Sequence, residues 1–137
     1  YKEFLDQLEK AGRKNSKAYG DTLQAIGLNF IKQEKFEQSI TYFQEAIETY
    51  GIVRPECPEE KGLAAFRLAH CYENNINVDI QYIEKYYVIG MKNMEKTRNR
   101  TLMQEALTNV IGFYARCEDP VKKRKYENKL EQLQYAE

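Results

Sequence analysis

The chain has 137 residues, 31% of them charged, and 21 basic residues balance 21 acidic ones. This length suits one domain or about three helical-hairpin repeats, and the neutral balance gives no overall attraction to nucleic acid or to an anionic membrane surface. No segment approaches the roughly 18 apolar residues of a membrane span and no signal peptide is recognisable, so we expect neither a nucleic-acid partner nor a membrane partner.

Apolar residues recur three and four positions apart along most of the chain, which predicts α-helices and no lasting strand. Ser16 and Asp79 are suited to cap helix N-termini, because their short side chains can accept hydrogen bonds from unpaired amides. The helices are separated by segments that contain proline or clusters of turn-forming residues, at 51–58, 74–79 and 119–120. The pattern predicts seven helices, at residues 2–13, 17–33, 36–50, 59–74, 79–95, 98–117 and 121–135.

One segment carries a spaced motif, Leu23-x2-Ile26-Gly27-x2-Phe30 followed by Phe36-x2-Ser39-x3-Phe43-x2-Ala46. Its order of large, small and aromatic residues resembles the tetratricopeptide (TPR) repeat. The small residue at Gly27 is matched by Ala69 and then by Val110, 42 and 41 residues further on. This period is similar to that of the long-repeat TPR branch, found in kinesin light chains, cell-polarity adaptors and peptide-sensing regulators of Gram-positive bacteria.

The resemblance implies an all-α fold, namely a right-handed solenoid of antiparallel helical hairpins with about three repeats and seven helices. Gly27 is then expected where the two helices of the first hairpin approach closely. We expect the chain, which begins at Tyr1, to be a fragment of a longer protein. The single domain over residues 1–137 would divide into a partial upstream repeat or cap at 2–15 and repeats at 17–53, 59–95 and 98–135.

TPR proteins bind their partners mostly along the first helices of the hairpins, which line a concave groove. The resemblance therefore implies a protein-interaction scaffold that binds a peptide segment of a partner. Carried over by position, the groove residues are Gln24, Leu28, Ile31, Lys32, Phe66, Arg67, His70, Asn74, Ile111 and Tyr114. Further candidates on the same helices are Asp21, Ala25, Glu73, Leu107 and Thr108.

The carboxylate clamp of the chaperone-binding TPR proteins is missing. Gln24 and Leu28 stand where the first lysine and asparagine of that clamp would be, and Gln104 and Thr108 replace its later lysine and arginine. The groove that remains would have an apolar floor and one cation, Arg67. Such a groove suits an extended or helical peptide with apolar anchors and one acidic residue.

Residues that could carry catalysis are sparse. The single histidine, His70, adjoins Cys71, but neighbouring helical positions point about 100° apart, so the two form neither a metal site nor a catalytic dyad. The common nucleotide and zinc motifs are absent. Three cysteines without a C-x-x-C pair are typical of reduced thiols. We therefore expect a cytoplasmic protein that is not an enzyme and has no cofactor or metal.

Two other functions stay open. The chain could be part of a bacterial peptide-sensing regulator, whose groove would hold a short imported peptide. It could instead be a self-associating structural module that forms a homodimer through the last helix, by an apolar stripe at Tyr126, Leu130 and Leu133 with Tyr135 and Ala136 beside it. We interpret the basic run at 122–125 as a solvated helix face, balanced by Glu118, Glu127 and Glu131.

Overall fold

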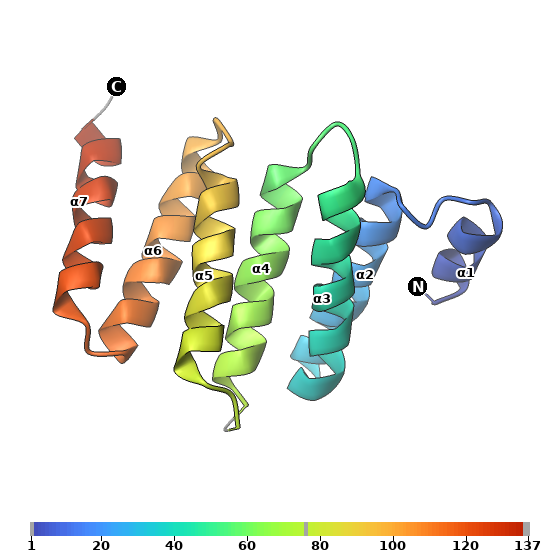
Figure 1. Cartoon of the computed structure of the whole chain (residues 1–137), viewed down its shortest axis with the longest axis horizontal. Helices are drawn as coiled ribbons and strands as arrows, with labels where there is room; N and C mark the ends of the chain where they lie inside the picture. Colours follow the sequence, from blue (N-terminus) through green and yellow to red (C-terminus); the bar gives the residue numbers. More distant parts are fainter. Residues whose placement is uncertain (1, 76, 136–137) are drawn as a thin grey trace.

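The computed structural model describes residues 2–75 and 77–135, and within them the chain folds into seven α-helices. The helices follow one another in a row from the N-terminal to the C-terminal end (Figure 1). They are α1 (Lys2–Lys10), α2 (Lys17–Lys32), α3 (Phe36–Ile52), α4 (Pro58–Glu73), α5 (Ile80–Met94), α6 (Arg100–Arg116) and α7 (Pro120–Tyr135). The predicted all-α class and the number of helices are confirmed. No helix in this part of the chain is long and apolar enough to cross a membrane.

Helix ends follow local hydrogen bonding. The side chains of Ser16 and Asp79 accept from the backbone amides of Tyr19 and Gln81, which confirms both predicted N-caps. The first helix ends at Lys10 rather than at residue 13, because Gly12 takes a left-handed conformation (φ 73°) that closes the helix. The sixth begins at Arg100 rather than at residue 98, because the side chain of Asn99 caps it by accepting from Leu102 N.

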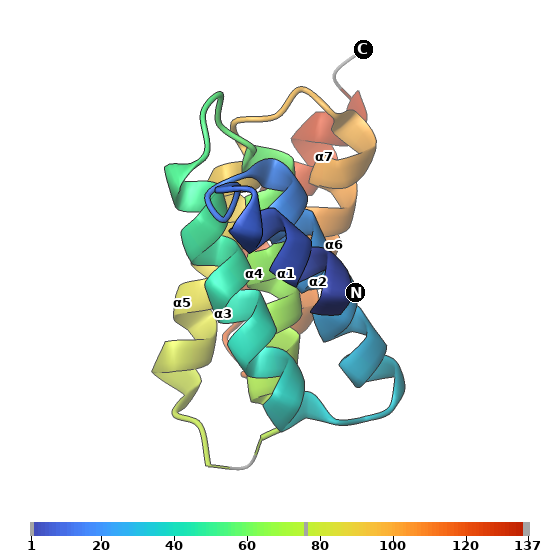
Figure 2. The ribbon, with the colours of Figure 1, turned by 90° about the vertical axis from the view of Figure 1, so that its right-hand side faces the viewer.

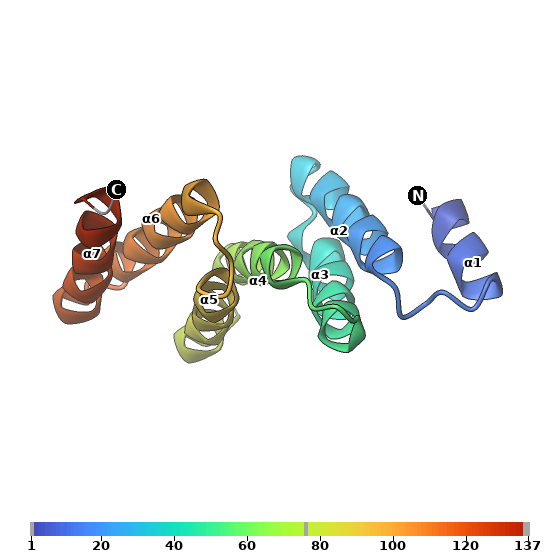
Figure 3. The ribbon, with the colours of Figure 1, turned by 90° about the horizontal axis from the view of Figure 1, so that it is seen from above.

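Each helix packs mainly against its neighbours in the chain. The main pairs are α2 with α3, α4 with α5 and α6 with α7, and α3 also packs closely on α4. Viewed along the row, the helices stack behind one another (Figure 2). From above, α4 lies recessed between α2 and α6, with α3 and α5 on the opposite side (Figure 3). This sequential pairing is consistent with a helical repeat, and the predicted division into repeats stays a prediction.

Two apolar clusters hold the row together. The smaller one joins α1, α2, α3 and the start of α4 around the buried rings of Tyr19 and Tyr50. The larger one extends from α3 to α7 and begins with Phe43, whose ring is fully buried. A Cβ atom added to Gly27 would lie 2.7 Å from Phe43 Cζ. The predicted close approach of the two helices at Gly27 is therefore confirmed.

The last helix directs its apolar stripe inward. Tyr126 is buried, with 8% of its surface exposed, and Leu130 and Leu133 are half-buried against the larger cluster. The large apolar side chains that α7 leaves exposed are Val121 and Tyr135. The predicted stripe therefore packs at least partly against the rest of the chain, and dimerisation through α7 stays a prediction. Ala136 lies outside the described residues.

Candidate functional site

An open cavity of about 770 Å³ lies on the side of the molecule formed by α2, α4 and α6. Helix α4, which is recessed between the other two (Figure 3), contributes more lining residues than any other helix. The lining residues are Leu28 and Ile31 of α2, Leu63, Phe66, Arg67, His70, Glu73 and Asn74 of α4, Tyr87 of α5, and Thr108, Asn109, Gly112 and Arg116 of α6.

Six of the ten predicted groove residues line this cavity together. They come from the first and middle hairpins and are Leu28, Ile31, Phe66, Arg67, His70 and Asn74. Glu73 and Thr108, which were further candidates, also line it. The structure therefore brings these residues to one place, and their role in peptide binding stays a prediction.

The other four predicted groove residues do not line the cavity. Gln24 is buried behind Arg67, and Lys32 is exposed at the end of α2. Ile111 is half-buried against the larger apolar cluster. Tyr114 is buried on the other side of α6, where its hydroxyl donates to Glu84 Oε2 at 2.8 Å.

Packing explains why Tyr114 of α6 faces away from the cavity. The ring of Tyr114 stacks on that of Tyr126, with 5.6 Å between centroids, so this face of α6 belongs to the hairpin with α7. The positions that α6 then turns towards the cavity are small or polar, namely Thr108, Asn109, Gly112 and Arg116.

Arg67 is held in place by an uncharged neighbour. Its Nη1 donates to Gln24 Oε1 at 2.6 Å, and Gln24 Nε2 donates to Tyr50 OH at 3.2 Å and to the backbone carbonyl of Glu60 at 3.1 Å. Within the described residues, no carboxylate oxygen lies within 4.0 Å of the Arg67 guanidinium. Burial lowers the pKa of Arg67, because desolvation disfavours its charged form.

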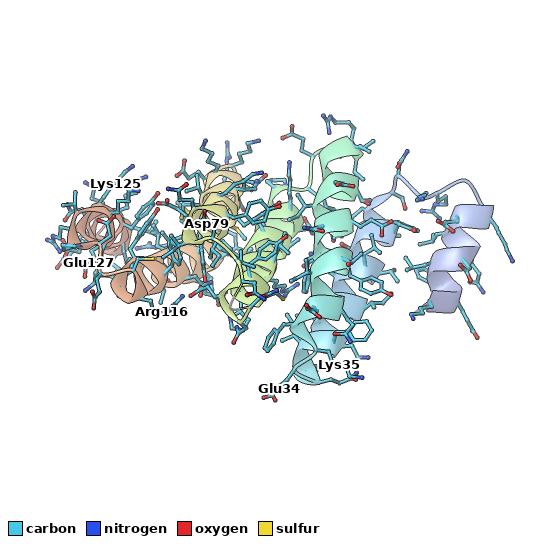
Figure 4. The ribbon with its side chains drawn as sticks, turned by 60° about the horizontal axis from the view of Figure 1, so that its bottom comes forward. Glu34, Lys35, Asp79, Arg116, Lys125 and Glu127 are labelled. Carbon is cyan, nitrogen blue, oxygen red and sulfur yellow. The ribbon has the colours of Figure 1, made fainter. Side chains whose placement is uncertain are left out.

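The second arginine of the cavity is paired. Arg116 donates from Nε to Glu73 Oε2 at 2.8 Å and from Nη2 to Glu73 Oε1 at 2.9 Å, and the hydroxyl of Tyr87 also donates to Glu73. Burial alone would raise the pKa of Glu73, but the hydrogen bonds from Arg116 and Tyr87 outweigh it and hold the pKa below its usual value. Figure 4 shows Arg116 on the α2–α4–α6 side and Lys125 on the opposite side. Of the two cavity arginines, Arg67 is the one without a carboxylate partner in the part of the chain that the structure describes.

The apolar part of the cavity lies beside these charges. Leu28, Ile31 and Leu63 are half-buried and pack against the larger cluster. Phe66 lines the cavity but is only 7% exposed, because its ring packs on Gly90 and Tyr87. A ligand would therefore meet both apolar surface and a positive charge.

Five lining residues were not predicted: Leu63, Tyr87, Asn109, Gly112 and Arg116. Leu63 was accessible to sequence reasoning, because it stands one helical turn before Arg67 on the same face. The pairing of Glu73 with Arg116 was not, because it joins residues 43 positions apart that only the packing of α6 near α4 brings together.

The described residues hold no cluster of three or more His, Cys, Asp or Glu side chains that could bind a metal ion. Cys71 is fully buried and lies 3.0 Å from Ser39 Oγ, whereas His70 is exposed, so the two point apart as predicted. Two of the four basic residues of the run on α7 form ion pairs, Lys122 with Glu84 at 2.9 Å and Arg124 with Glu131 at 3.2 Å. No protein-family model matches the chain, and a search of curated proteins finds no match.

Proposed function

We propose that this chain is a TPR-like scaffold, a right-handed solenoid of about three helical hairpins, that binds a peptide segment of a partner protein. The peptide lies in the cavity across α2, α4 and α6. The protein acts by binding rather than by catalysis, needs no cofactor or metal, and works in the cytoplasm. The observation that carries this proposal is the cavity itself, because helices from three successive hairpins contribute its lining.

The composition of the cavity supports a peptide ligand. Its volume of about 770 Å³ falls in the range of ligand sites, roughly 300–1,000 Å³. Leu28, Ile31 and Leu63 offer an apolar wall, while Asn74, Thr108 and Asn109 offer polar groups for a peptide backbone. A groove formed along helices with apolar anchor positions is a recurring mode of peptide recognition.

The test is selection of ligands from a random peptide library displayed on phage, followed by affinity measurement with fluorescent synthetic peptides. Asn109 is exposed at the cavity, so Asn109→Trp should occlude it with little effect on folding. We expect this variant to weaken a selected peptide by about tenfold or more. Lys92→Trp places the same side chain at an exposed position of α5 that does not line the cavity, and it should leave the affinity unchanged.

Two outcomes of the library experiment would contradict the proposal. If no peptide binds saturably, the protein is not a peptide-binding scaffold. If peptides bind equally well to the wild type and to Asn109→Trp, the binding site lies elsewhere. Phe66→Ala is less suitable as a test, because truncating this buried ring would cost about 3–5 kcal/mol of stability.

The regulator alternative uses the same cavity with a different ligand. A peptide-sensing regulator would hold a short free peptide, whereas a scaffold would hold a segment within a longer chain. Comparing selected sequences as free peptides and as internal loops of a carrier protein separates the two. Binding that is kept in the internal loop supports the scaffold.

A further inference from the structure

We propose that Arg67 is a subsite for an acidic side chain of the bound peptide, and that Gln24 keeps this arginine available by holding it without neutralising its charge. This inference rests on the proposed function, since it specifies the chemistry of the peptide that the cavity takes.

The charge of Arg67 is the first step of the argument. The side chain is half-buried in the cavity wall, and among residues 2–75 and 77–135 its one hydrogen bond to another side chain goes to the neutral Oε1 of Gln24. The other charges of the lining are Glu73 and Arg116, which bind each other. In the formal charge count, which leaves histidine out, the lining therefore carries one surplus positive charge, located on Arg67. A carboxylate from a ligand would compensate this charge and form charge-assisted hydrogen bonds with the remaining guanidinium donors.

Gln24 is fixed in the orientation that this role requires. An amide nitrogen has two hydrogens to donate, and those of Gln24 go to Tyr50 OH and to the Glu60 carbonyl. Its oxygen is thereby left to accept from Arg67. Tyr50 is itself held, because its hydroxyl donates to Asp21 Oδ1 at 2.6 Å. A glutamate at position 24 would pair with Arg67 directly and remove the surplus charge.

The position of Arg67 along α4 indicates an acid within the peptide rather than a C-terminal carboxylate. Leu63 lies one turn before Arg67, and His70 and Asn74 lie one and two turns after it, on the same face of the helix. All of them line the cavity. The lining therefore continues on both sides of Arg67, so a ligand chain can extend in both directions from the residue that meets it. Leu28 and Ile31 add apolar lining from α2.

The experiment uses a random library of peptides with blocked C-termini, selected against the wild-type chain. We expect Asp or Glu to be enriched at one position next to apolar residues. A selected peptide and its amide analogue (Glu→Gln or Asp→Asn) are then measured against wild type, Gln24→Glu and Arg67→Gln. The acidic peptide should lose about tenfold or more of its affinity on either substitution, and the amide analogue less than about threefold. Gln132→Glu makes the same charge change on the exposed face of α7 and should alter neither affinity.

The outcomes separate this inference from the proposed function. If no peptide binds, the proposed function fails. If peptides bind but show no acidic residue, or if the acidic peptide binds Arg67→Gln as well as wild type, the Arg67 subsite is wrong and the scaffold stands. Binding that requires a free C-terminus would overturn the assignment to an internal side chain. Thermal unfolding of each variant shows whether it is folded, and should Gln24→Glu not fold, Arg67→Gln decides.

Discussion

The first and middle hairpins make the same kind of close helix crossing with the residue roles exchanged. In the first hairpin the glycine stands on the first helix, and a Cβ at Gly27 would lie 2.7 Å from Phe43 of α3. At the crossing of the middle hairpin that involves Phe66, the glycine stands on the second helix, and a Cβ at Gly90 would lie 2.9 Å from the ring of Phe66 on α4. A second glycine of this hairpin, Gly62, stands on α4, and a Cβ there would lie 3.0 Å from Met94 Cε of α5. A close crossing therefore needs a small residue opposite a large one, on either helix.

This exchange has a consequence for the cavity. Phe43 belongs to the second helix of its hairpin and is fully buried. Phe66 belongs to the first helix of its hairpin and lines the cavity between α2, α4 and α6. A residue that closes the middle hairpin thus also contributes to the lining of the candidate site.

The largest expected effect comes from filling the crossing of the first hairpin. Gly27→Leu should lower the free energy of unfolding by more than about 2 kcal/mol, because overpacking costs about 1–3 kcal/mol and here the added side chain meets a fully buried ring. Urea denaturation followed by circular dichroism measures this change.

Gly51 provides the matched control for this substitution. It lies near the end of α3, and the nearest atom to an added Cβ is Lys61 Nζ at 3.8 Å. Gly51→Leu should therefore not destabilise the protein, and should stabilise it by up to about 1 kcal/mol through helix propensity. A cost below about 0.5 kcal/mol for Gly27→Leu would contradict the close crossing at this position.

A smaller loss is expected from the reversed crossing. Gly90→Ala adds one methyl group against the ring of Phe66, and we expect a loss of about 1–2 kcal/mol after the gain in helix propensity. The pair should be coupled: combined with Phe66→Leu, the substitution at Gly90 should cost less than it does alone. A double-mutant cycle by urea denaturation measures the coupling, and additive effects would show that ring and glycine are independent.

Sequence reasoning predicted the helices well and the site in part. The repeat motif was recognisable in the first hairpin because Gly27 and Phe43 stand in the order that the pattern expects. In the middle hairpin the crossing at Phe66 and Gly90 has its glycine on the second helix, so a pattern that expects the small residue on the first helix does not identify it. Helical spacing predicted the cavity residues on α4, because residues three or four positions apart lie on the same face of a helix.

The other predicted groove residues miss the cavity because packing against neighbouring helices decides which face of each helix is turned towards it. Gln24 has the spacing of a groove residue, but hydrogen bonds to Tyr50 and Glu60 keep it buried behind Arg67. Tyr114 has the spacing too, but it packs towards Tyr126 in its own hairpin. Periodicity identifies a face of a helix but not which of two neighbouring helices that face meets.

A smaller loss of stability is expected at the junction between the middle and last hairpins, where an ion pair joins α4 and α6. The contact between α5 and α6 is less extensive than the contacts within the hairpins, and Arg116 of α6 reaches across to Glu73 of α4. Glu73→Gln should lower the free energy of unfolding by about 1 kcal/mol at neutral pH, since Arg116 is partly exposed and its ion pair is screened. Urea denaturation of wild type and variant across a pH series measures this difference.

The pH dependence of that loss follows from the lowered pKa of Glu73. A carboxyl group whose pKa is lower in the folded state stabilises the protein above its ordinary pKa, near 4.5, and loses this contribution as the pH falls through the folded value. The difference between wild type and Glu73→Gln should therefore shrink below that pH. Glu105→Gln, at an exposed glutamate of α6, should show almost no difference at any pH. A constant difference across the pH series would mean that the charge of Glu73 is not the cause.

The smallest effect is expected at Gly112 of α6, and it should have the opposite sign to that at Gly90. A Cβ here would approach only Arg116 Nη1, at 3.2 Å, and the end of an arginine side chain can move aside. Gly112→Ala should therefore raise the free energy of unfolding by up to about 0.5 kcal/mol, because alanine favours the helix by about 1 kcal/mol and the displacement of Arg116 offsets part of this gain. Denaturation of Gly112→Ala beside Gly90→Ala compares the two glycines directly. A loss at Gly112 as large as that at Gly90 would show that α6 also makes a close crossing at its glycine. The last hairpin would then resemble the first two in this respect.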